Sequence, residues 1–215
     1  MKTHVQRTVS RCFAALRQLR QIRRSVPPDT FQSLIVSLVI SRVDYGNAVL
    51  VGLPVYLVRR LQSVLNAEAR LIYHMRSADH ITDALISLHW LRASQWIEYK
   101  VAVLTYKVLQ GSAPRYLGPL VPVADLQGRR TLRSAGTNRL VVPSVRLSNV
   151  GSRAFSVAAP RIWNALPAEA TSAQSLTLFR RHLKSWLFSQ SYPDLIIWLL
   201  LKTVKLRFVT LPTLK

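Results

Sequence analysis

GSRAFSVAAPRIWNALP, residues 151–167, is too apolar for a linker and too basic for an ordinary core. Phe155 and Trp163 offer large surfaces to bury, while Arg153 and Arg161 keep cationic groups at the edge of the stretch. We therefore predict a segment that ends in a helix, packs against the protein on one side and faces an anionic group on the other.

The composition sets the broad class of the protein. A chain of 215 residues with 49% hydrophobic and 18% charged residues can form one domain or two small ones around a buried core. The balance of 30 Lys and Arg against 9 Asp and Glu gives a formal charge of +21. Self-repulsion of that size destabilises a compact fold unless an anionic partner neutralises it, and nucleic acid is the leading partner. The alternative is that arginine-rich chains translated from repetitive genomic DNA are basic whether or not they bind anything.

Cysteine usage and hydropathy bear on the compartment. The single cysteine, Cys12, excludes an internal disulfide and any multi-cysteine zinc site, so we expect an intracellular chain. The first residues lack the apolar core of a signal peptide. The apolar run at 195–201 has about a third of the ~20 residues that span a bilayer, so we expect no membrane helix and no membrane partner.

The fold class follows from apolar residues that recur every three or four positions in several segments. The segments expected to be helical are about 4–24, 31–39, 55–75, 82–88, 94–110 and 175–188. The segment 94–110 is apolar on both sides, which predicts the central buried helix, and Gly111 should end it. Residues 121–150 instead contain short β-prone runs that predict a small hairpin or extended loops. The sequence therefore predicts a mainly α protein, a helical bundle with a short β-prone segment near 121–160.

Positive charge gathers in two tracts. Residues 2–24, the first basic tract, carry seven Lys or Arg and no acid, and residues 129–161, the second basic tract, also carry no acid. Arginine presents a planar fork that suits phosphate, although a solvated helix face explains the first tract equally well. The candidate contacts to nucleic acid are Arg17, Arg24, Arg129, Arg130, Arg133, Arg139, Arg146, Arg153 and Arg161.

Tryptophan could add base stacking to these contacts. Trp90, Trp96 and Trp163 each lie within an apolar run, however, which favours packing in the core over stacking on bases.

Residues suited to catalysis are not grouped in the sequence. The histidines lack metal-ligand spacing, and there is no Gly-x-Ser-x-Gly turn for a serine nucleophile. Glu68 falls on the apolar face of its helix, where it should pair with an arginine or stay neutral. We therefore expect no catalytic residue, no metal site, no cofactor and no small-molecule substrate.

Several motifs resemble one family when they are read together. They are residues 41–54 (SRVDYGNAVLVGLP), 79–82 (DHIT), 88–91 (LHWL), 97–100 (IEYK) and 151–188. In order and in approximate spacing they resemble the C-terminal end of the reverse transcriptase of jockey-like LINE (non-LTR) retrotransposons. The resemblance covers about residues 1–188.

The resemblance implies a division of the chain and a function. It implies a helical thumb-like domain at 1–118, a basic β-prone segment with a helix at 119–188 and an unrelated tail at 189–215. In that family the thumb holds the template–primer duplex by its backbone, while clustered carboxylates that hold two metals perform the polymerisation. Those carboxylates are missing here, which implies a non-catalytic fragment of an RNA-directed DNA polymerase. Its partners would be the backbone of RNA or DNA, bound without sequence preference, and the remainder of a reverse transcriptase.

The competing hypothesis is an inert or protein-interaction product of a drifted element copy. Four residues depart from the family pattern, namely Gly46, Glu68, Arg92 and Trp96. The tail adds a further departure, because the resemblance ends before it.

Overall fold

The computed structural model describes residues 1–126 and 138–194, and within them the protein is mainly helical, which confirms the predicted fold class. Three predicted contact residues, Arg129, Arg130 and Arg133, lie outside the described residues, as does the apolar run at 195–201. The helices are α1 (Lys2–Ile22), α2 (Pro28–Ile35), α3 (Ser41–Asp44), α4 (Val55–Ile72), α5 (Thr82–Ser87), α6 (Ala93–Leu109), α7 (Ser148–Gly151), α8 (Phe155–Ala165), α9 (Ala168–Thr171) and α10 (Leu176–Ser191).

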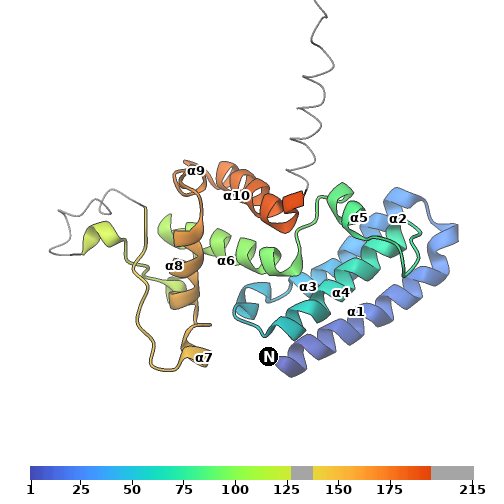
Figure 1. Ribbon diagram of the computed structural model, residues 1–215, viewed down its shortest axis with the longest axis horizontal. Coiled ribbons are helices and arrows are strands. Elements are labelled where there is room, and N and C mark those ends of the chain that lie inside the picture. The colour runs from blue at the N-terminus through green and yellow to red at the C-terminus, as the bar shows by residue number, and fades with distance from the viewer. Residues whose placement is uncertain (127–137, 195–215) are drawn as a thin grey trace, which may run out of the picture.

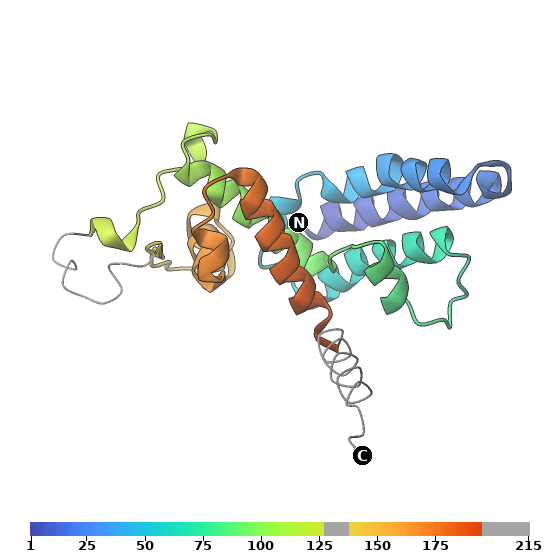
Figure 2. The same ribbon diagram turned by 90° about the horizontal axis from the view of Figure 1, so that it is seen from above.

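The N-terminal half is built on α1 and α4, which lie side by side and run in the same direction (Figures 1 and 2). The predicted apolar stripe of α1 is buried, with Val5, Cys12 and Leu19 at most 3% exposed. Burying an aliphatic side chain of this size stabilises the fold by about 1.5–3 kcal/mol. The chain returns from the end of α1 through α2 and the π-helical turn Val36–Ile40 into α3.

The predicted central helix is α6, which links the two halves of the molecule. Ile97 belongs to the same hydrophobic cluster as α1 and α4, whereas Val101 and Tyr106 belong to a second cluster with α8 and α10. Gly111 ends the helix as predicted. Its left-handed conformation, at φ +67°, lets the N–H of Ser112 donate to the carbonyl of Lys107. Since α6 contributes to both clusters, the domain boundary predicted at residue 118 stays a prediction.

The stretch 151–167 forms the helix expected at its end, α8. Its inward face buries Val157 and Trp163, and the Trp163 ring stacks on Phe179 of α10 with ring centroids 5.7 Å apart. Trp163 is 3% exposed. Trp90 and Trp96 are half-buried and also pack on hydrophobic clusters, so core packing of the tryptophans is confirmed.

The β-prone segment does not form a strand in the part of the chain that the structure describes. One antiparallel bridge joins Pro122 to Leu140, and the expected hairpin is otherwise replaced by extended chain and by α7 and α8. The side chain of Asn164 covers the edge of Leu140 that faces away from Pro122, since its amide accepts from the N–H of Leu140 and donates to the carbonyl of Leu140, both at 2.8 Å. A helix side chain therefore satisfies the backbone groups that a partner strand would use.

The end of α10 reaches further than the predicted boundary at residue 188. α10 continues to Ser191, and Tyr192 is buried with its hydroxyl donating to the carbonyl of Trp90 at 2.8 Å. The first residues assigned to an unrelated tail are thus part of the packed structure. Across 1–126 and 138–194, no helix combines the length and the apolarity that crossing a membrane requires.

Candidate nucleic-acid interface

A groove of about 1110 Å³ lies between the C-terminal half of α1 and the C-terminal end of α4. We call it the arginine groove. Its lining residues are Phe13, Leu16, Arg17, Arg20, Gln21, Arg23, Arg24, Ala67, Arg70, Leu71, His74, Met75, Arg76 and Ser77.

The first wall of the arginine groove comes from the helical period of α1. Arg17, Arg20 and Arg24 follow one another at intervals of three and four residues, which places them on one side of the helix and the short 3-10 turn that follows it. All three side chains are exposed. They flank the buried apolar stripe of α1. The stripe packs the helix against α4, and the arginines beside it remain available to an anion.

The second wall comes from the end of α4 and the turn after it. His74, two residues after α4, adopts the left-handed conformation, at φ 56°, and the N–H of Met75 donates to the carbonyl of Arg70 at 3.0 Å. Glycine usually takes this position, and another residue there costs about 1–3 kcal/mol. The sharp reversal keeps Arg76 beside the same groove as Arg70.

Arg23 closes one end of the groove and has a structural role. Its Nη2 donates to the carbonyl of Ile72 at 2.7 Å, and its guanidinium lies 5.5 Å from the centre of the Phe31 ring. Burial lowers the pKa of this guanidinium below its usual value. A cation at the C-terminal end of α4 also complements the helix dipole.

No described acidic side chain neutralises the charge of the arginine groove. Among the residues that the structure describes, none of the lining residues is acidic. Within the described residues the one ion pair is Lys100–Asp44, at 2.8 Å between Nζ and Oδ2, which joins α6 to α3 away from the groove. The next acid in sequence, Asp79, accepts from the backbone N–H of Arg76 at 2.5 Å. Like charges on the walls of a groove reinforce one another and attract anions.

The lining of the arginine groove also contains apolar residues, which we call its floor. Leu16 is 6% exposed, and Phe13 and Leu71 are half-buried against the α1–α4 core. Met75 is half-buried against a smaller cluster that includes α5. The groove therefore combines cationic walls with a hydrophobic base.

The predicted contact residues divide between different surroundings. Arg17 and Arg24 line the arginine groove. Arg139, Arg146 and Arg161 are exposed but do not line it, so the described part of the second basic tract does not join this surface. The sequence prediction omitted Arg20, Arg23, Arg70 and Arg76.

Arg153 contacts the protein backbone, and its predicted contact with an anion stays a prediction. Its Nε donates to the carbonyl of Val51 at 3.2 Å, and its aliphatic stem lies on Gly52. Gly52 has φ +68°, and a Cβ at this position would come within 2.9 Å of Cγ of Arg153. The side chain therefore fastens the segment before α8 to the turn before α4.

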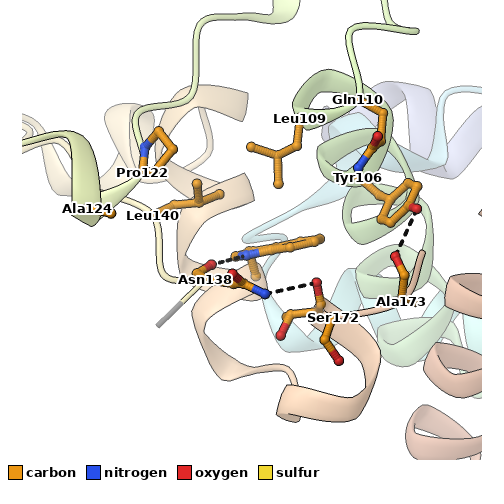
Figure 3. A pocket seen from close by; sticks show the side chains of 11 residues that line it. Tyr106, Leu109, Gln110, Pro122, Ala124, Asn138, Leu140, Ser172 and Ala173 are labelled. Carbon is orange, nitrogen blue, oxygen red and sulfur yellow. Dashed lines mark hydrogen bonds between the residues drawn. The ribbon is translucent and has the colours of Figure 1, made fainter. Parts of the chain in front are cut away.

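A second pocket, of about 430 Å³, lies between the end of α6, α8 and the Pro122–Leu140 bridge (Figure 3). Its polar groups are largely occupied, since Tyr106 donates to the carbonyl of Ala173 at 3.1 Å and Trp163 donates to the carbonyl of Asn138 at 2.6 Å. Among the residues that the structure describes, no charged side chain lines this pocket.

The carboxylates are dispersed. Among the described residues, no three of His, Cys, Asp and Glu come together as metal ligands would. Glu68 is fully buried, neither of its oxygens has a hydrogen-bond partner in the described structure, and burial raises its pKa to about 8. Of the two predicted outcomes for Glu68, the described structure shows no arginine partner, and the raised pKa favours a neutral carboxyl at neutral pH.

Within residues 1–126 and 138–194, the arginine groove is accordingly the surface best suited to a charged ligand. It has cations on two walls, no acid in its lining and a size beyond the range of about 300–1,000 Å³ typical of drug-sized ligands. No protein-family model, curated protein or solved structure matches this chain.

Proposed function

We propose that this protein binds the phosphate backbone of nucleic acid, without sequence preference, through the arginine groove. The observation that carries the proposal is the convergence of six arginines from α1, the turn after it, the end of α4 and the following turn, in a lining without acid. Arginine–phosphate contacts position a nucleic acid but do not read its bases. The predicted activity is therefore sequence-independent.

Binding of this kind depends steeply on salt, because each neutralised phosphate releases condensed counterions. Arg23 is held by the carbonyl of Ile72, which leaves five lining arginines for phosphates. Five phosphate contacts give a slope of about −4 when the logarithm of the binding constant is plotted against the logarithm of the salt concentration. A filter-binding or anisotropy series from low to physiological salt measures this slope.

The two basic surfaces can be compared directly by matched substitutions. One variant carries Arg17→Gln, Arg20→Gln and Arg24→Gln in the arginine groove. The control carries Arg139→Gln, Arg146→Gln and Arg161→Gln, which lowers the net charge by the same amount at exposed sites outside the groove. We expect the groove variant to bind at least about tenfold more weakly and to lose about 2–3 from the magnitude of the salt slope. Equal losses in both variants would contradict a localised site.

We further propose that the chain is a non-catalytic fragment of a retrotransposon RNA-directed DNA polymerase. The mainly helical fold supports this proposal. So does the ion pair between Asp44 and Lys100, because each residue lies in a motif that carries the resemblance. A separate palm would supply the catalytic carboxylates. Adding such a palm and measuring primer extension with and without this chain tests the proposal, and no change in extension counts against it.

The competing proposal is a drifted copy without a nucleic-acid role, and Glu68 favours it. A buried carboxyl with no partner costs stability unless it stays protonated. A cooperative thermal transition together with salt-sensitive binding would exclude this alternative, whereas a broad melt and no retention of nucleic acid would support it.

A further inference from the structure

We infer that the arginine groove takes a single-stranded segment of nucleic acid, with phosphates on its walls and bases on its floor, in preference to a duplex. This inference rests on the proposed function and specifies its substrate class. It follows from the width of the groove, its floor and its unused donors.

The width of the groove favours a single strand. α1 and α4 pack directly against each other, and directly packed helices have axes about 8–10 Å apart. The furrow above their contact is no wider than this spacing. A duplex is wider, since the major and minor grooves of B-DNA, about 8.5 and 7.5 Å deep, lie on opposite sides of it. A duplex can therefore rest only on the outer arginines, whereas a single strand can lie along the furrow.

The floor of the groove has no use in duplex binding. Phe13, Leu71 and Met75 present partly exposed apolar surface in the same lining as the arginines. Phosphates gain nothing from such surface, but unpaired bases do, because every base has a π-face that stacks on apolar and aromatic side chains. Single-strand sites combine a positive groove with this kind of platform.

The donors on the walls complete the site. Arg17, Arg20 and Arg24 lie on one wall, and Arg70 and Arg76 lie on the other, so a strand between them meets cations on both sides. Nε of Arg70 is buried and has no hydrogen-bond partner in the described structure, although the side chain lines the groove. A buried donor without an acceptor is costly, so a shift of this side chain toward a phosphate in the groove would gain it an acceptor.

The experiment compares a labelled 16-nucleotide RNA without self-complementarity with the same RNA in a duplex, at one salt concentration. The full chain and three variants are titrated. Phe13→Leu keeps the apolar volume but removes the ring from the floor, and Met75→Ala shortens a second floor residue. Phe155→Leu is the control, because Phe155 is a half-buried phenylalanine of α8 outside the groove. Thermal melts establish that each variant is folded at the assay temperature.

We expect the single strand to bind at least about tenfold more tightly than the duplex. Phe13→Leu should weaken single-strand binding by about fivefold or more, which corresponds to the stacking of one base. Met75→Ala should act in the same direction, and Phe155→Leu should change neither affinity by more than about twofold.

The outcomes separate the inference from the proposed function. Duplex binding as tight as single-strand binding, or equal effects of Phe13→Leu on both, would overturn the inference and leave backbone binding intact. Failure to bind either RNA would overturn both. Binding to phosphatidylserine vesicles with no RNA binding would identify an anionic membrane surface as the ligand and would also overturn both.

Discussion

Glu68→Gln should stabilise the protein by an amount that grows with pH. Burial raises the pKa of Glu68 from 4.5 to about 8, so the folded state holds this proton more tightly than the unfolded state does. The proton that Glu68 binds in the folded state contributes its full stabilisation below pH 4.5, the pKa of this group in the unfolded chain. That stabilisation is lost as the pH rises through about 8, the pKa in the folded state. Glutamine preserves the shape of the side chain and cannot ionise.

The magnitude follows from the same two pKa values. Each unit of separation corresponds to 1.36 kcal/mol, so the wild-type protein should lose about 3 kcal/mol of unfolding free energy between pH 5 and pH 8 through this one group. That loss is a large share of the 5–15 kcal/mol by which domains are stable. The thiol of Cys12, whose pKa is raised to about 11, does not titrate in this range.

The assay is urea denaturation followed by circular dichroism at several pH values between 5 and 8. The difference between Glu68→Gln and wild type isolates this group, because titrations common to both proteins cancel. We expect that difference to grow by about 3 kcal/mol across the range. Glu169→Gln, at an exposed site on α9, is the control and should show a flat difference. A flat difference for Glu68→Gln would refute the claim that its carboxyl is buried without a partner.

Three further substitutions test particular contacts, each by chemical denaturation. Gly52→Ala should destabilise the fold by about 1–3 kcal/mol, because alanine is strained at φ +68° and meets the stem of Arg153; a neutral effect would contradict the packing of that stem. Asp44→Asn should cost less than about 1 kcal/mol, since the pair with Lys100 is about one-third exposed, and the cost should shrink in salt. Tyr192→Phe should cost about 1 kcal/mol through its lost hydrogen bond, and no cost would place residue 192 outside the folded structure.

Features that depend on local sequence were predictable. The buried stripe of α1 follows from the helical period, and the end of α6 follows from Gly111, because glycine adopts the required backbone conformation without strain. α8 also lies within the stretch that predicted it. In each case one short segment contains all the information needed.

Features made by distant segments were not predictable. The arginine groove joins Arg17 to Arg76, and only the packing of α1 on α4 brings them together. Arg76 follows the end of α4 in a turn where apolar residues do not recur at a helical period. The local sequence therefore does not predict which way its side chain points. The hydrogen bond of Arg153 was not predictable for a related reason, since its carbonyl partner lies 102 residues away in sequence.

Photocrosslinking of a 4-thiouridine-labelled RNA, followed by mass spectrometry of the crosslinked peptides, tests the central claim most directly. We predict crosslinks to peptides from residues 13–24 and 67–77, which contain the lining of the arginine groove. Crosslinks concentrated in residues 138–161, or none above those of a protein-free control, would contradict binding in the groove.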